Sequence, residues 1–309
     1  MPRLEILAFH RVLDPGERYF IPPMTLARPT FVKLLDALAG GYEILDLRES
    51  VSRLENGSLP ERCLSLTFDD GYVDNYALAR ECLSAKGIPA TFFLPLRQID
   101  SGRPYWWDHL RWAAQQFPGK FQEWAPNALP GYSAAAHPKD TRSLVRRLNE
   151  ASREERGAFL AALEREFGLY RGPRLLMDWD EARELWSAGF AIGSHTLSHE
   201  PLTDLDPGEA AVEIRESRTA LAERLGAPVS GFCYPRGAHS GFLAGLVKEA
   251  GYAYAVTTGF GSNSPGQNVF LLRRRSIADY RGWRGKWPVL ASRIEISGIL
   301  DFWLAKRRP

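Results

Sequence analysis

The stretch Leu64–Gly71, LSLTFDDG, joins an apolar run to two adjacent carboxylates, Asp69 and Asp70. A short apolar run that ends at turn-forming residues is typical of a buried strand. Far downstream, in the sequence SHTLSH, His195 and His199 stand four positions apart. One Asp and two His form a ligand set that suits a divalent metal with open positions, and a second Asp can act as a base. The two motifs together predict a metal-dependent hydrolase.

Strand-like and helix-like segments alternate along most of the chain. The predicted strands cover residues 4–9, 42–47, 63–68, 90–94, 190–193, 229–234, 252–257 and 269–276. The predicted helices cover residues 30–39, 47–54, 72–86, 180–188, 207–225 and 241–250. Such alternation indicates a parallel sheet covered by helices, and the carboxylates and histidines follow strands, where α/β barrels place catalytic groups. The predicted fold class is therefore α/β, a distorted or incomplete (β/α) barrel.

Two segments depart from this alternation. Residues 100–177 contain several tryptophans and then a charged helical stretch, and we expect an insertion within a barrel domain of residues 1–277, with solvated side chains at His109 and His137. Residues 278–309 form a basic, tryptophan-rich C-terminal extension. Basic residues mixed with tryptophans suit a membrane surface or a lipid-phosphate-bearing glycan. The alternative is a solvated helix that packs its aromatic face on the barrel.

The composition excludes several classes of protein. The 39 basic and 37 acidic residues nearly balance, which argues against a dedicated nucleic-acid binder. The three cysteines form no CxxC pair, so neither a disulfide framework nor a zinc knuckle is indicated. We find no run of about 18 apolar residues and no signal-peptide pattern at the N-terminus. The expected location is the cytoplasm, with peripheral contact at the inner membrane face if the extension binds lipid, and no protein partner can be inferred.

The motifs TFDDG (67–71) and HTLSH (195–199) together resemble the signature pair of the polysaccharide deacetylase family, the NodB-homology enzymes of carbohydrate esterase family 4. The segment FCYPRG (232–237) is similar to the third motif of that family. The segments LAFH (7–10) and YWWD (105–108) resemble members that serve exopolysaccharide synthesis. The resemblance implies a NodB-type barrel and hydrolysis of N-acetyl groups on N-acetylhexosamine units. The substrate would be a bacterial polysaccharide or its lipid-linked precursor.

The resemblance also implies a role for each matched residue. Asp70, His195 and His199 would hold the metal, and Asp69 would be the general base that takes a proton from the attacking water. The backbone N–H of Arg236 would stabilise the oxyanion. The ligand set suits zinc, and also cobalt, nickel or iron(II).

Two positions depart from the family pattern. The third motif usually carries an arginine two residues before its proline, and Cys233 stands there instead. Arg274 is the candidate that supplies the missing guanidinium. The usual C-terminal Leu-x-His is absent too, because no histidine follows His239. In a circularly permuted barrel His10 would occupy that place, and we predict it as the general acid; the alternative is a hydrogen-bonded core histidine.

Four further residues are predicted to contact substrate: Tyr234 and Pro235 in the third motif, Asp74, and Trp107. Capping of the following helix is the alternative for Asp74, and a place in the core is the alternative for Trp107.

Two other functions fit the same sequence. The first is a deformylase or another linear-amide hydrolase that acts on a lipid-linked sugar or a small amide. The second is a glycan-binding pseudoenzyme, because Cys233 and the missing late histidine depart from the active family pattern.

Overall fold

The computed structural model describes residues 2–17, 24–129 and 141–277. The C-terminal extension with its predicted membrane contact, and His137, lie outside these ranges. The described chain forms two compact units, one built from residues up to 100 and from 176 onward, the other from residues 101–175. That they are a barrel domain and an insertion in it stays a prediction. Among the described residues, none of the helices combines the length and apolarity needed to span a bilayer.

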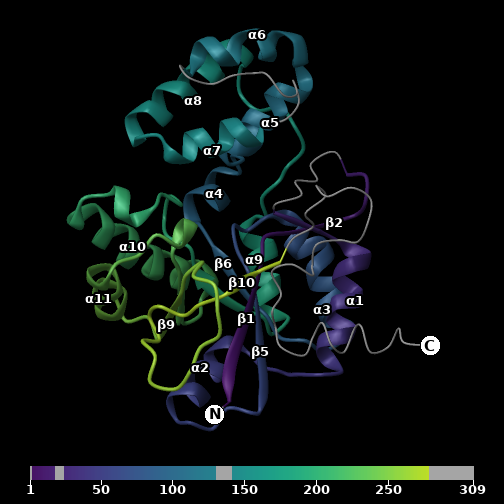
Figure 1. Ribbon diagram of the computed structural model, residues 1–309, viewed down its shortest axis with the longest axis vertical. Helices are drawn as coiled ribbons and strands as arrows, with labels where there is room; N and C mark the ends of the chain where they lie inside the picture. Colours follow the sequence, from purple (N-terminus) through teal and green to yellow (C-terminus); the bar gives the residue numbers. More distant parts are fainter. Residues whose placement is uncertain (1, 18–23, 130–140, 278–309) are drawn as a thin grey trace. The chain divides into compact units, whose positions relative to one another are not determined.

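A parallel sheet forms the centre of the larger unit (Figure 1). Within the described residues its order is β10-β1-β5-β6-β7-β8-β9, and β4 pairs with the first half of β5. The bounds are β1 Arg3–Phe9, β4 Glu43–Ile44, β5 Arg62–Phe68, β6 Thr91–Leu94, β7 Ala191–Ser194, β8 Gly231–Cys233, β9 Tyr254–Val256 and β10 Arg275–Ser276. A separate parallel pair is made by β2, Arg11–Leu13, and β3, Thr25–Ala27.

The segment that follows β9 connects the two edges of the sheet. Leu272 forms a parallel bridge with Val256 of β9, and three residues later Arg275 pairs with Leu7 of β1. One short segment thus touches strands from both edges, so the parallel sheet is curled as a half-barrel. The predicted α/β class and distorted (β/α) barrel are confirmed.

The strand predicted over residues 269–276 is wrong except for its last two residues, which form β10. The side chain of Asn263 explains the difference. Its Oδ1 accepts a hydrogen bond from the backbone N–H of Arg273 at 2.8 Å, and its Nδ2 donates to the Arg273 carbonyl at 2.9 Å. Because a side chain takes both backbone groups, Arg273 has none left for a strand neighbour.

Helices surround the sheet, and most lie where the sequence places them. Their bounds are α1 Arg28–Ala39, α2 Leu47–Glu55, α3 Arg80–Ser84, α4 Leu96–Ser101, α9 Trp179–Ser187, α10 Pro207–Leu225 and α11 Gly241–Glu249. The helix predicted over residues 72–86 differs. Tyr72 pairs with Leu176 as an isolated bridge, and a π-helical turn, Asn75–Ala79, precedes α3. Such π turns occur frequently beside functional sites.

Aromatic side chains on neighbouring strands form the core under the helices. The rings of Phe9, Phe68 and Phe92 stack in turn, with centroids 5.1 and 4.9 Å apart, across β1, β5 and β6. The next residue on β6, Phe93, faces the opposite side of the sheet, because side chains alternate along a strand. A Cβ added to Gly193 of β7 would lie 2.5 Å from the Phe93 ring. Glycine at this position therefore makes room for the ring.

The smaller unit is helical and has its own apolar core. Its helices are α5 Trp106–Gln116, α6 Pro118–Ala128, α7 Arg142–Glu150 and α8 Arg153–Phe167. Phe121, Phe159 and Leu163 are buried in that core. His109 is buried as well and hydrogen-bonds to the carbonyl of Gly168 at 3.0 Å, so the expectation of a solvated side chain is wrong.

We predict that Gly193→Ala lowers stability by about 1–3 kcal/mol, because the new methyl group overpacks the barrel interior. Thermal unfolding measures the effect. The matched control is Gly245→Ala on α11, where a Cβ meets nothing within 4 Å and helix propensity alone should raise stability. Adding Phe93→Leu to Gly193→Ala should recover part of the loss. Equal melting temperatures for Gly193→Ala and the unmodified protein would contradict the packing argument.

Candidate metal centre and active site

The pairing of β1 with β5 brings His10 to the two carboxylates. Phe9 lies opposite Phe68 in the parallel register, so His10 and Asp69 follow at the same edge of the sheet. The Asp69 N–H donates to the Phe9 carbonyl at 2.9 Å and fixes this alignment. His10 thus follows β1 at the edge of the sheet where the carboxylates follow β5, and its role as general acid stays a prediction.

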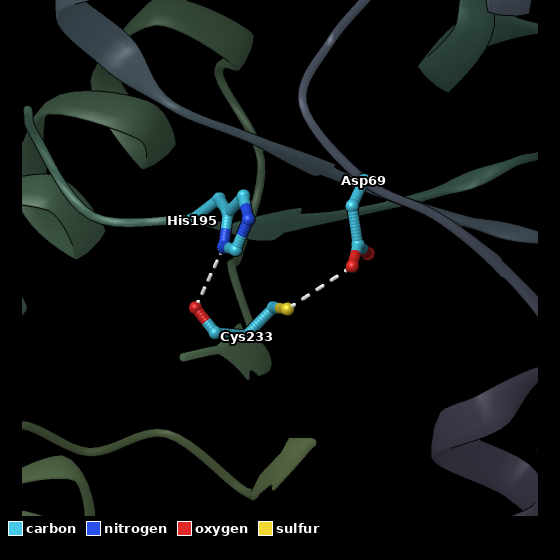
Figure 2. A group of neighbouring side chains, drawn as sticks. All are labelled: Asp69, His195 and Cys233. Carbon is cyan, nitrogen blue, oxygen red and sulfur yellow. Dashed lines mark hydrogen bonds between the residues drawn. The ribbon is translucent and has the colours of Figure 1, made fainter. Parts of the chain in front are cut away.

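Asp70, His195 and His199 bring three ligand atoms together. Asp70 Oδ1 lies 3.4 Å from His195 Nε2 and 3.2 Å from His199 Nε2, and all three side chains are nearly or fully buried. His195 Nδ1 lies 2.8 Å from the Cys233 carbonyl (Figure 2). A carbonyl only accepts, so Nδ1 carries a proton and is engaged, and Nε2 is the nitrogen that faces Asp70 and could bind a cation once it is deprotonated. This donor set, with one imidazole already oriented, fits a divalent cation.

Backbone strain is concentrated at the motifs. Within the described ranges, the non-glycine residues with positive φ are Asp70 (73°), Thr196 (69°), His199 (62°) and Arg236 (57°). Each belongs to one of the three motifs, and such conformations persist only where the surroundings impose them. Thr196 is one such support, because its hydroxyl accepts a hydrogen bond from the His199 N–H at 3.0 Å.

Glu213 on α10 supports the histidine loop from outside the motifs. Its Oε2 accepts hydrogen bonds from the N–H groups of Leu197 and Ser198, both at 2.9 Å, and its Oε1 accepts from the Ser198 hydroxyl at 2.7 Å. These residues lie between His195 and His199, so one buried carboxylate holds the loop that presents both imidazoles. Sequence reasoning missed Glu213, because a glutamate in an amphipathic helix carries no signal of its own.

Arg274 supplies the guanidinium that the third motif lacks. Its Nη1 and Nη2 donate to the two oxygens of Asp69 at 2.8 and 2.7 Å, and its Nε donates to the Thr257 carbonyl at 2.9 Å. Burial raises the pKa of Asp69, but the charge and hydrogen bonds of Arg274 outweigh it and bring the pKa below its ordinary value. Asp69 is therefore held ionised, and the predicted replacement by Arg274 is confirmed.

Asp69, His195 and Cys233 form a second group with metal-ligand atoms close together (Figure 2). The Cys233 thiol lies 3.6 Å from Asp69 Oδ2, and Arg274 Nη2 lies 3.2 Å from its sulfur. Burial raises the pKa of this thiol, so it is uncharged near neutral pH. The guanidinium already provides the positive charge beside Asp69, which leaves the Asp70, His195 and His199 set as the better cation site.

The third motif forms a tight turn after β8. Arg236 lies in the 3₁₀ turn Pro235–Gly237. A Cβ on Gly237 would lie 2.0 Å from the Thr258 hydroxyl, so only glycine fits there. Tyr234 is fully buried and donates to the Phe270 carbonyl at 3.1 Å. The oxyanion role of Arg236 and the substrate contacts of Tyr234 and Pro235 stay predictions.

Asp74 binds the residues that follow His10. Its carboxylate accepts from Arg11 Nε at 2.9 Å and from the Val12 N–H at 2.8 Å. It makes no capping bond to the following helical turn, so that alternative is wrong. Trp107 belongs to the smaller unit, where its ring stacks on Tyr105 with centroids 4.3 Å apart. Contact of Asp74 or Trp107 with substrate stays a prediction.

Comparison with known proteins agrees with these motifs. The family model described as "Polysaccharide deacetylase" matches residues 56–255, well over half of the chain. The chain belongs to the polysaccharide deacetylase family. Members of this family are hydrolases that act on linear amide C–N bonds. The resemblance read from the motifs, and the predicted enzyme class, are confirmed at the level of the family.

Individual relatives are distant in sequence. "Putative polysaccharide deacetylase YxkH" of Bacillus subtilis (strain 168) is 21% identical over 239 residues, 77% of this chain and 60% of that protein. The chain thus spans only 60% of the length of this curated relative. The solved Streptococcus pyogenes deacetylase PplD has a TM-score of 0.62 at 18% identity, covering 90% of this chain and 94% of that one. IcaB from Ammonifex degensii has a TM-score of 0.60 at 21% identity, and the match covers 90% of this chain and 93% of that one. These two structures share the fold.

We predict that Arg274→Met moves the acid limb of the pH–activity profile to higher pH. Without the guanidinium, burial raises the pKa of Asp69, so less of the base is ionised near neutral pH, and activity there should fall by about 100-fold or more. Arg274→Lys keeps the charge but loses the paired hydrogen bonds, so its activity should lie between those of the unmodified protein and Arg274→Met. The measurement is kcat/KM against pH, with circular dichroism to confirm folding. A folded Arg274→Met variant with an unshifted profile would refute the assignment.

We predict that Glu213→Ala weakens metal binding by about 10- to 100-fold, the usual effect of removing a group that orients metal ligands. Glu213→Gln retains one acceptor oxygen and should lose less metal affinity. The control is Glu216→Ala, an exposed glutamate on the same helix. Competition with a chelator measures affinity, and thermal unfolding of the metal-free proteins separates loop support from general stability. Equal affinities for the Glu213 and Glu216 variants would exclude this role.

Proposed function

We propose that the protein is a metal-dependent deacetylase that hydrolyses N-acetyl groups of N-acetylhexosamine units in a bacterial polysaccharide or its precursor. The observation that carries this proposal is the pair of adjacent carboxylates with different partners. Asp70 lies against two imidazoles, whereas Asp69 is held by Arg274. An exopolysaccharide role is part of the proposal, supported by the resemblance of residues 7–10 and 105–108 to members of that group.

Asp70, His195 and His199 would hold the cation, for which we propose zinc. When bound, a divalent cation there would act as a Lewis acid that polarises the acetyl carbonyl and makes water more acidic. Two nitrogen ligands and one carboxylate suit zinc, and leave positions open for substrate and water. The structure of PplD is of a complex with acetate, the product that we propose for this chain.

The chain's own residues would carry the proton transfers. Asp69 takes a proton from water as the water oxygen forms a bond to the acetyl carbon, and the backbone N–H of Arg236 donates to the oxyanion that develops. His10 then gives a proton to the sugar nitrogen as the C–N bond breaks. The products are acetate and a free amine on the sugar. Arg274 keeps Asp69 ionised and fixes its orientation at the start of this sequence.

A related hydrolase could release formate instead of acetate, from a lipid-linked sugar or a small amide. The same carboxylates and imidazoles would serve, because the attacked bond is an amide in both cases. Product analysis on N-acetyl and N-formyl hexosamines separates the two substrates. Glycan binding with no turnover by the metal-loaded protein would instead support the pseudoenzyme.

We predict that Asp70→Ala abolishes both metal content and acetate release. Elemental analysis of the purified protein and an acetate assay on N-acetylglucosamine oligomers measure the two effects. Asp74→Asn serves as a control for metal content alone, because it also alters a buried carboxylate next to the first motif while leaving the three proposed ligands in place. Full acetate release by metal-free protein would overturn the proposal.

We predict that His10→Ala lowers kcat by about 100- to 10,000-fold while the metal stays bound, because the leaving amine loses its proton donor. Metal analysis is the deciding measurement alongside activity. Loss of the metal from His10→Ala would instead make this histidine a ligand.

A further inference from the structure

A polar groove of about 730 Å³ lies between the loop that follows β9 and the start of β1. We call it the arginine groove, since Arg3, Arg273 and Arg275 line it together with His239 and neutral polar residues such as Ser262. No carboxylate is among its lining residues in the described chain. A concave site with cations and hydrogen-bond donors but no acid favours a negatively charged ligand.

Two of the three arginines have no ionic partner. Arg275 pairs with Glu5, with Nε 2.8 Å from Oε2. By contrast, Arg3 and Arg273 are exposed and make no ion pair with any of the residues that the structure describes. The groove therefore carries positive charge that the protein itself does not neutralise.

Arg275 also retains unused donor capacity although it is largely buried, at 6% exposure. Its Nε donates to Glu5 and its Nη2 donates to the Ser262 hydroxyl at 3.2 Å. Its Nη1 is buried and has no hydrogen-bond partner among the described residues. A buried guanidinium nitrogen without an acceptor is unfavourable, and such a group commonly marks a place where a ligand or water belongs.

The loop Gly259-Phe260-Gly261 lets Arg273 lie close to the backbone. A Cβ on Gly261 would be 3.2 Å from the Arg273 Cδ, and a Cβ on Gly259 would be 3.7 Å from its Cγ. Gly261 also has a φ of 141°, which an L side chain rarely adopts. These glycines hold the Arg273 stem against the wall of the groove.

The groove is connected to the proposed active site through two of its lining residues. Thr257 accepts the Nε–H of Arg274, the residue that holds Asp69, and His239 follows the turn that carries Arg236. Thr257 and His239 follow β9 and β8 at the edge of the sheet that carries the motifs, whereas Arg3 begins β1 at the other edge, so the groove extends away from the proposed site. Arginine recognises phosphate and carboxylate oxygens through paired N–H donors.

We propose that the arginine groove binds an oxyanion, a phosphate or a carboxylate, that the substrate glycan carries. The link to substrate rests on the proposed deacetylase function, but binding of the anion itself does not. The preferred substrate is then an anionic glycan, such as one with sugar phosphates or uronic acids, in which the N-acetyl group lies near the charged unit.

Calorimetric titration of the full chain with inorganic phosphate, glucuronate and uncharged N-acetylglucosamine tests this proposal. The Asp70→Ala variant is used as the background, so that anions cannot bind at the proposed metal centre. We expect phosphate or glucuronate to bind, with affinity that falls as salt rises. The anion that binds with the higher affinity indicates whether the glycan carries a phosphate or a carboxylate. Binding should weaken about tenfold or more in Arg273→Ala and Arg3→Ala, because each removes a charged donor.

Two further variants make the result specific. Gly261→Ala should also lower the affinity for the anion, because the new methyl group displaces the Arg273 stem. Arg215→Ala, an exposed arginine on α10 outside the groove, should leave binding unchanged. Absence of anion binding, or equal affinities in all four variants, would overturn the proposal. Neither result depends on acetate release, so the anion-binding proposal can fail or hold independently of the deacetylase proposal.

Discussion

The buried ion pair between Arg274 and Asp69 is the contact on which the site depends. Both side chains are almost fully buried, and both Nη atoms of the guanidinium donate hydrogen bonds to the carboxylate. A buried carboxylate without a partner becomes protonated, whereas a paired one stays ionised. The pair also joins distant parts of the chain, because Asp69 follows β5 and Arg274 lies where the sheet edges meet. The ionisation of Asp69 and the closure of the barrel thus depend on the same interaction.

Much of this arrangement can be read from the sequence. The alternation of apolar strands with helices gives the parallel sheet, and the motifs at residues 67–71 and 195–199 follow β5 and β7 as predicted. α10 begins after Asp206 and ends before Gly226, because Asp206 accepts hydrogen bonds from the first turn and Gly226 takes the left-handed conformation. Local capping and periodicity carry this information.

Other features depend on contacts that no local pattern encodes. The segment 269–274 has the composition of a strand, but the side chain of Asn263 binds the backbone of Arg273 and interrupts the pairing. Glu213 resembles other helical glutamates until its partners across the unit are known. His109 lies between charged and aromatic residues, yet its ring is buried near Tyr170 and hydrogen-bonds to the Gly168 carbonyl. In each case a residue distant in sequence decides the outcome.

The position of Arg274 has a consequence for how the protein is made. Residues of the site range from His10 to Arg274, and the segment that closes the sheet leaves the ribosome after the strands that it joins. Non-local pairings of this kind form slowly, and a partly synthesised chain lacks them. Until that segment docks between β9 and β1, Asp69 lacks the guanidinium that orients its carboxylate and keeps it ionised once it is buried. A nascent chain therefore carries its first two motifs before the proposed base has its partner, and docking of Arg274 completes the site.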